Sequence, residues 1–386
     1  MDNKVYAVPC SEYRNTEEKL KALLGLMGGM DGFVQKGETI ILKPNLLLPA
    51  EPEKAVTPHP EVVTAVLKMI NETGAKALIT DSAGSGFSHT KKTLDRLYDK
   101  CGIKEAALKG QAELNFDTSF KIISFPEGKL IKRFEIITPV LKADGLINLC
   151  KLKTHSFMSM TGAVKNLFGV IPGRTKPGYH AKLYHPDRFA AMLLDLAAYI
   201  SPRLSVMDAV VGMEGNGPSG GTPKKAGFLL AASDPLALDV VAGEMMGLQK
   251  IDNPVLAEAE RRGLKPIYPD DIELIGAEFK DLRIPGFELP KTIGKESGFG
   301  IPSVLGNLVS SLFVKAATLK PVINRNKCTA CGACRDACPE KVITLIDNSY
   351  ARIDPKNCIR CYCCHEMCRF DAVDLQSSRF FRFISR

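Results

Sequence analysis

The chain has 386 residues, more than one ordinary domain needs and enough to bury a substantial core. Apolar residues make up 45% and charged residues 24%, an ordinary balance for a globular protein, and no apolar run approaches the roughly 20 residues that cross a bilayer. The net charge of +8 is too small an excess to indicate a nucleic-acid-binding protein, although it allows a modest attraction for anionic small molecules.

Residues 1–290 alternate short apolar runs with amphipathic helices, the pattern of a layered α/β domain with a mostly parallel sheet. Strands are predicted at 39–43, 75–80, 143–149, 204–207 and 228–232. Helices are predicted at 60–72, 90–101 and 185–200. Asp234 followed by Pro235 indicates one more helix start, with a capping carboxylate and a proline in the first turn. Residues 265–325 lose this rhythm, and residues 291–321 are predicted to form a tether with an amphipathic helix at 301–319.

Residues 322–376 hold two cysteine runs with the same C-x2-C-x2-C-x3-C spacing, which wraps a [4Fe–4S] cluster. Three cysteines of one run grip one cluster, and the fourth reaches the neighbouring cluster. We predict two ligand sets, one of Cys328, Cys331, Cys334 and Cys368 and one of Cys358, Cys361, Cys364 and Cys338. Zinc sites usually show two separated C-x2-C pairs, and a disulfide framework needs an oxidising compartment. The spacing therefore favours two clusters, and the region resembles a bacterial two-cluster ferredoxin domain.

The first residues contain no hydrophobic signal core, so a reducing cytoplasm is the expected location. Residues 377–386 alternate bulky apolar and cationic side chains. Such a tail could lie on a membrane surface, but ten residues are few for an interfacial helix. We expect instead a strap over the protein's own surface, and we expect no membrane binding.

In an open α/β sheet, ligands bind beyond the carboxyl ends of the strands. The residues that follow the predicted strands are polar or glycine, and include Lys43, Asn45, Asp81, Gly84, Lys151, Lys153, His155, Asp208, Gly215, Gly217, Asp234 and Asp239. The segment 151–185 is the richest, because it adds Lys165, Asn166, Arg174, Lys176, His180 and His185. Cations near glycine-rich turns suit a carboxylate or a phosphate, and histidines suit proton transfer or metal ligation.

The alternative for this segment is a solvated loop whose charges face water. Gly84 and Gly86 suggest a dinucleotide-binding turn, but His89 stands where the pattern needs its third glycine. We select His155, Lys165 and Lys153 as candidate catalytic residues. The candidate residues for an organic or nucleotide cofactor are Lys43, Asn45, Asp81, Gly84, Lys151, Asn166, His180, Gly215 and Gly217.

Several of these segments resemble the domain of unknown function 362 family, whose members often carry a two-cluster ferredoxin tail. The matching segments are Leu42–Asn45, Thr57–Pro60, Lys151–His155, Thr161–Asn166, Pro172–Gly173, Asp234–Asp239 and Cys358–Cys368. The resemblance covers nearly the whole chain, but it implies an architecture rather than a reaction.

A fainter likeness links His155, Thr161-Gly162, Lys165 and Pro172-Gly173 to nickel-pincer lactate racemases. In those enzymes a lysine tethers the pincer nucleotide, and histidines ligate nickel or act as acid and base. The likeness implies a tether-like role for Lys165, an acid/base role for His155 and a ligand role for His180. The glycine pattern is only partly kept, so we infer at most a related organic or nucleotide anion and no nickel.

The sequence thus favours an iron–sulfur oxidoreductase that exchanges electrons with a low-potential donor or acceptor protein and with an anion held by the α/β domain. Two alternatives stay open. One is a non-catalytic electron carrier or assembly factor whose α/β domain docks a protein partner. The other is a racemase-like enzyme in which the clusters are structural.

Overall fold

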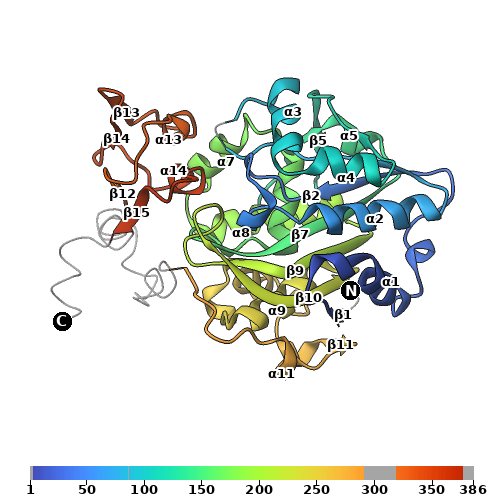
Figure 1. Ribbon diagram of the computed structural model, residues 1–386. Helices are drawn as coiled ribbons and strands as arrows, with labels where there is room; N and C mark the ends of the chain where they lie inside the picture. Colours follow the sequence, from blue (N-terminus) through green and yellow to red (C-terminus); the bar gives the residue numbers. More distant parts are fainter. Residues whose placement is uncertain (1–2, 86, 291–318, 377–386) are drawn as a thin grey trace.

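The computed structural model describes residues 3–85, 87–290 and 319–376. The predicted tail at 377–386 and the predicted tether helix, apart from Leu319, lie outside these residues. The described chain forms an α/β body, residues 3–85 and 87–290, and a small cysteine-rich region beside it, residues 319–376 (Figure 1). This agrees with the predicted fold class, a layered and mostly parallel sheet followed by a small α+β ferredoxin-like region.

The body is built on a nine-stranded sheet with the order β11-β1-β10-β9-β7-β2-β3-β4, and β8 pairs with β7 beside this path. The strands in this order are β11 (Glu273–Ile275), β1 (Lys4–Pro9), β10 (Thr222–Ala232), β9 (Leu204–Glu214), β7 (Gly145–His155), β2 (Thr39–Pro44), β3 (Lys76–Ile79), β4 (Glu113–Leu114) and β8 (Ser159–Met160). Neighbouring strands from β9 to β4 are parallel, whereas β10 is antiparallel to both β9 and β1. A separate hairpin pairs β5 (Phe120–Ser124) with β6 (Arg133–Ile137).

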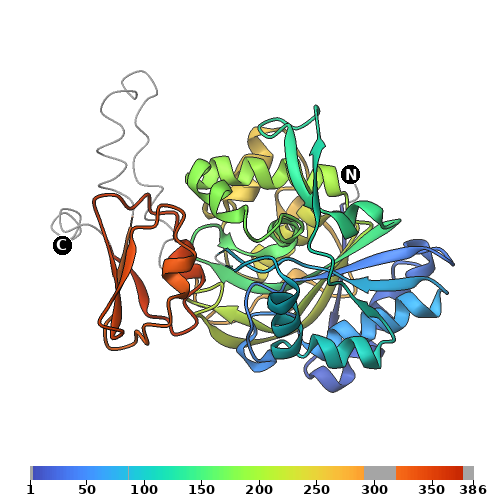
Figure 2. The same ribbon diagram turned by 90° about the horizontal axis from the view of Figure 1, so that it is seen from above.

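Helices cover both faces of the sheet (Figure 2). One face packs against α1 (Thr16–Gly25), α2 (Pro60–Glu72), α3 (Lys91–Lys100) and α4 (Ile103–Lys109). The other face carries α6 (Gly162–Asn166), α8 (Pro186–Ile200), α9 (Pro235–Met246) and α10 (Pro254–Arg261), while α5 (Thr138–Lys142), α7 (Lys176–Lys182) and α11 (Phe279–Leu282) are peripheral. Helix α2 has the predicted bounds, and its apolar residues, from Val62 to Ile70, are buried at helical spacing.

Strands β7, β9 and β10 extend well beyond their predicted bounds, and this changes where the polar residues lie. Strand β7 continues to His155, so Lys151, Lys153 and His155 belong to the strand and do not follow its end. Strand β9 likewise continues beyond Asp208. The expectation that Asp234 lies at the carboxyl edge is wrong, because the antiparallel β10 ends beside the start of β9, at Ala232 opposite Ser205.

Asp234 keeps its predicted capping role, since its side chain accepts a hydrogen bond of 2.8 Å from the backbone N–H of Leu236 in α9. One turn later, Asp239 accepts hydrogen bonds from the backbone N–H groups of Ala163 and Val164 at the start of α6. Asp239 therefore fixes the short helix that carries two of the predicted site residues.

The cysteine-rich region has two short antiparallel sheets and two short helices. These are β12 (Lys320–Ile323) with β15 (Val373–Gln376), β13 (Ile343–Ile346) with β14 (Tyr350–Ile353), α13 (Ala333–Asp336) and α14 (Cys363–Glu366). Both views place α14 on the side of the region that faces the body (Figures 1 and 2). The second cysteine run therefore lies at the contact between the two parts.

Candidate functional site

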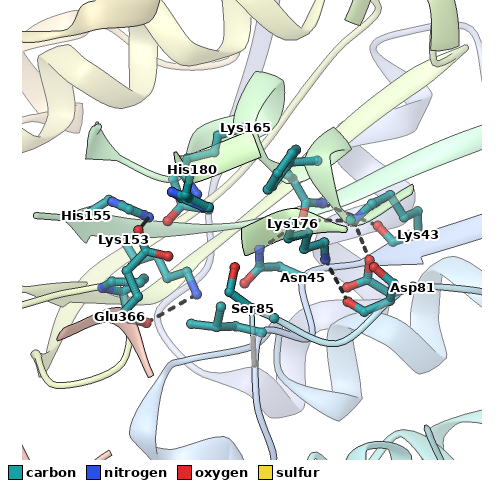
Figure 3. Close-up of a pocket in the computed structure, with 18 residues that line it drawn as sticks. Lys43, Asn45, Asp81, Ser85, Lys153, His155, Lys165, Lys176, His180 and Glu366 are labelled. Atoms are coloured by element: carbon teal, nitrogen blue, oxygen red, sulfur yellow. Dashed lines mark hydrogen bonds and ion pairs between the residues drawn. The ribbon is translucent and has the colours of Figure 1, made fainter. Parts of the chain in front are cut away.

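A cavity of about 50 Å³ lies where the carboxyl ends of β2, β3 and β7 meet α6, α7 and the second cysteine run (Figure 3). We call it the lysine pocket. Its polar lining residues are Lys43, Asn45, Asp81, Ser82, Ser85, Lys153, His155, Thr161, Lys165, Asn166, Lys176, His180 and Glu366. One water molecule needs about 10–15 Å³, so this volume suits a small ligand of a few atoms.

One end of the pocket is held by a buried ion pair between Lys43 and Asp81, whose charged atoms lie 3.0 Å apart. Lys43 also donates hydrogen bonds to the carbonyl of Pro44 at 3.1 Å and to Oδ1 of Asn166 at 3.2 Å. Burial lowers the pKa of Lys43, and the nearby carboxylate of Asp81 opposes this effect. A Cβ atom at Gly169 would overlap both partners of the ion pair, so the close approach of the chain here requires glycine.

Two further lysines are held by backbone carbonyls. Lys176 donates to the carbonyls of Ser82 at 3.2 Å and Ala83 at 2.9 Å. Lys153 donates to the carbonyls of Val56 at 2.7 Å and Pro218 at 3.3 Å. Burial lowers the pKa of Lys176 to about 7, and burial together with the charge of Lys165 holds the pKa of Lys153 well below its usual value.

Lys165 differs from the other three lysines. It lies deep in the protein, lines the pocket and is partly accessible, yet within the described residues its amine has no hydrogen-bond or ion-pair partner. Burial lowers its pKa, against the opposing effects of Glu366 and Cys363. Its side chain is therefore free to contact a ligand.

Two neutral imidazoles line the pocket. Nδ1 of His155 accepts hydrogen bonds from the backbone N–H groups of Phe157 at 3.1 Å and Met158 at 3.3 Å. Burial and neighbouring cations hold the pKa of His155 well below its usual value, and burial lowers that of His180 to about 3. The His180 ring packs against Phe189, with ring centres 4.6 Å apart.

The cysteine-rich region supplies the remaining wall of the pocket through Glu366, which is 3% exposed. Oε1 of Glu366 lies 3.4 Å from Nε2 of His155. Three hydrogen bonds dock this part of the chain on the body. Ser219 donates to the carbonyl of Glu366 at 2.5 Å, the side chains of Ser156 and His365 lie 2.8 Å apart, and Asn216 donates to Asp371 at 3.2 Å.

The pocket has an excess of positive charge. Four lysines line it, at 43, 153, 165 and 176, against two carboxyl groups, at 81 and 366. With neutral imidazoles and every lysine protonated, the excess is two positive charges. A buried charge that lacks a partner is costly, so this lining suits a ligand with one or two negative charges.

Nine predicted site residues line the pocket. They are Lys43, Asn45, Asp81, Gly84, Lys153, His155, Lys165, Asn166 and His180. Three others do not line it, because Lys151 is held by Asp208 at 2.7 Å and by Tyr13 at 3.0 Å, and Gly215 and Gly217 lie in the turn between β9 and β10. Lys176, which belongs to the basic segment 151–185 but not to the candidate site residues, also lines the pocket.

The cysteines of the two runs gather around two further cavities. Three cysteines of the first run and one of the second line one small cavity, namely Cys328, Cys331, Cys334 and Cys368. The complementary set lines the other, namely Cys338, Cys358, Cys361 and Cys364. Cys363 lines neither cavity.

Backbone N–H groups point at several of these sulfur atoms. Ala351 donates to Cys328 at 3.4 Å, Arg360 to Cys358 at 3.4 Å and Ala372 to Cys368 at 3.2 Å. Four thiols around one cavity, with N–H donors aimed at the sulfurs, form a donor set that fits a [4Fe–4S] cluster.

Comparison with known proteins finds a family match for each of the two parts of the chain. The model of the family described as domain of unknown function (DUF362) matches residues 40–244, and that of the 4Fe-4S binding domain matches residues 321–344. The thylakoid-associated protein sll1697 of Synechocystis sp. is 32% identical over 303 residues, which cover 77% of this chain and 89% of that protein.

Among solved structures, the lactate racemase apoprotein from Thermoanaerobacterium thermosaccharolyticum aligns with a TM-score of 0.39 and 15% identity, over 64% of this chain and 57% of the racemase chain. No helix in residues 3–85, 87–290 and 319–376 is long and apolar enough to span a bilayer. The matches to the family model and to the cyanobacterial relative decide the assignment. The chain belongs to the DUF362 family and carries a C-terminal 4Fe-4S binding domain.

Proposed function

We propose that this protein is an iron–sulfur oxidoreductase with two [4Fe–4S] clusters, which exchanges electrons with a low-potential redox protein and acts on an anionic substrate or cofactor in the lysine pocket. One observation carries the proposal. Cys364 lines a cysteine cavity, and Glu366, in the same helix α14, lines the lysine pocket. A single short helix thus forms part of the wall of both cavities.

Each cysteine cavity would hold one cluster. Cys328, Cys331, Cys334 and Cys368 would hold the outer cluster, and Cys338, Cys358, Cys361 and Cys364 the cluster next to the body. When bound, such clusters supply one-electron transfer at potentials of about −700 to +450 mV. The N–H groups of Ala351, Arg360 and Ala372 would stabilise the negative charge on the thiolates.

In the lysine pocket, Lys165 and Lys176 would neutralise the bound anion, since both line the cavity and Lys165 has no partner in the described chain. Lys153 would add positive charge from its fixed position between two carbonyls. The fold around the pocket keeps Lys153, His155 and His180 almost wholly away from solvent, which strengthens every electrostatic contact with the ligand.

The test is metal analysis and native mass spectrometry of protein purified without oxygen. We expect about eight iron atoms per chain, as two [4Fe–4S] clusters require, and a bound organic or inorganic anion. The anion should be lost from the variant Lys165→Met, which should keep its iron. Zinc in place of iron would refute the cluster assignment, and an empty pocket with a tightly bound protein partner would favour the carrier hypothesis instead.

A further inference from the structure

Two unpaired polar atoms face each other across the contact between the body and the cysteine-rich region. Nε2 of His155 and Oε1 of Glu366 are both buried and lack a hydrogen-bond partner within the described chain, although they lie 3.4 Å apart. An unsatisfied buried polar group costs roughly 1–3 kcal/mol, so a pair of them in a pocket indicates a ligand that satisfies both.

The backbone fixes which of these atoms donates. Because Nδ1 of His155 accepts hydrogen bonds from Phe157 and Met158, it carries no proton. The neutral ring must then carry its proton on Nε2, which makes this atom a hydrogen-bond donor. His155 is thus placed to donate to a ligand oxygen and not to act as a base through Nε2.

Glu366 offers the opposite function. An ionised carboxylate only accepts hydrogen bonds, and three lysines that line the same pocket, Lys153, Lys165 and Lys176, bring positive charge to it. A carboxylate in an anion pocket repels a ligand that has no donor, but it binds a ligand that offers an O–H or N–H group. The other pocket carboxylate, Asp81, is already partnered by Lys43 and by the N–H of Leu46 at 2.9 Å.

We propose that Glu366 and His155 together determine ligand specificity, and that the lysine pocket selects anions that keep an O–H or N–H donor next to their charge. Hydrogen phosphate and hydroxy- or amino-substituted carboxylates share this chemistry. The inference rests on the proposed function of the pocket and narrows its substrate class. It also means that the cysteine-rich region contacts the ligand directly through Glu366, which is two positions from both Cys364 and Cys368.

Phosphate and sulfate provide a matched pair of probes, because both are tetrahedral dianions at pH 8 and only hydrogen phosphate has an O–H group. We would titrate each into full-length, cluster-loaded protein by anaerobic calorimetry. Wild-type protein should bind phosphate at least about tenfold more tightly than sulfate, the value of one good charged hydrogen bond. In Glu366→Gln the amide can donate to sulfate, so the affinity ratio should fall towards one.

Asp81→Asn is the control, because it alters a pocket carboxylate that already has partners. It should change both affinities together and leave their ratio as in the wild type. Equal affinities in the wild type, or a ratio that survives Glu366→Gln, would overturn the inference while the pocket remains an anion site. If neither anion binds and Lys165→Met changes nothing, the proposed function fails as well. Should Glu366→Gln lose iron, the wild-type ratio decides alone.

Discussion

Lys165 allows a direct test of whether the lysine pocket is built for binding or for stability. Replacing it by methionine removes the amine and keeps a flexible apolar chain of similar length. Because the amine has no partner in the described residues and is held in a largely desolvated site, its removal should stabilise the ligand-free protein. The same change should weaken phosphate binding by at least about tenfold, since a charged contact to the anion is lost.

The magnitude follows from the contacts that each lysine makes. Lys165 is partly accessible, so removing its amine should raise the free energy of unfolding by only about 1 kcal/mol. This corresponds to a rise of roughly 2–4 °C in the unfolding midpoint. Lys153→Met is the matched control, because it strips a donor from the carbonyls of Val56 and Pro218. That loss should cost about 2 kcal/mol and lower the midpoint by roughly 4–8 °C.

The assay is anaerobic thermal unfolding of wild type and both variants at one iron content and without added anions, followed by phosphate titration. Opposite signs for the two midpoint shifts would support the assignment of Lys165 as a binding residue. If Lys165→Met destabilises the protein as much as Lys153→Met does, Lys165 has a structural partner and the reasoning is refuted. Unchanged phosphate affinity in Lys165→Met would refute its binding role independently of stability.

Three further predictions concern the cysteines and the titrating groups. Cys361→Ala and Cys331→Ala should each lower the iron content from about eight to about four atoms per chain. Cys363→Ala should leave the iron content unchanged, because Cys363 lines neither cysteine cavity. Iron analysis and electron paramagnetic resonance would test both expectations. Burial lowers the pKa of Lys176 to about 7, so its charge is lost as the pH rises beyond that value. The ratio of phosphate affinities between wild type and Lys176→Met should then fall by up to about tenfold per pH unit above 7, and a constant ratio would contradict this. Burial raises the pKa of Asp239 from 3.8 to about 7. Between these two pH values the native state therefore binds more protons than the unfolded state does. The free energy of unfolding should consequently fall as the pH rises through that range. Unfolding midpoints at pH 5 and pH 7 should show this fall in the wild type and a smaller one in Asp239→Asn.

Much of the body could be predicted from the sequence because its local signals agree with the fold. Helix α2 is bounded by Pro60 and Glu72, as its apolar spacing and the following turn at Gly74 indicate. The extent of β7 could not be predicted, because Lys151 and Lys153 look like loop residues in the sequence. They are buried in the strand only because Asp208 and two backbone carbonyls provide partners from elsewhere in the chain.

The direction of β10 was within reach of the sequence. Only seven residues, 215–221, connect β9 to β10. A parallel pairing of adjacent strands needs a crossover of about a dozen residues or more, whereas a short glycine-rich turn favours a hairpin. That limit places Asp234 at the opposite edge of the sheet from the pocket, as the pairing of Ala232 with Ser205 shows.

Glu366 is the site residue for which the sequence offered the weakest signal, and the reason is physical. The spacing of the second run specifies its cysteines, while the residues between them are free to vary without affecting that pattern. Yet His365 and Glu366 are adjacent polar residues at a position that a cluster-binding loop would bury. A buried polar pair needs partners, and the cysteine-rich region supplies one of them, the carbonyl of Val373, which lies 2.6 Å from Nδ1 of His365. The body supplies others, because Ser156 lies 2.8 Å from Nε2 of His365 and Ser219 donates to the backbone carbonyl of Glu366. Polar residues inside a cluster motif therefore indicate the surface on which that motif docks, and here Glu366 makes the docked surface part of the wall of the lysine pocket.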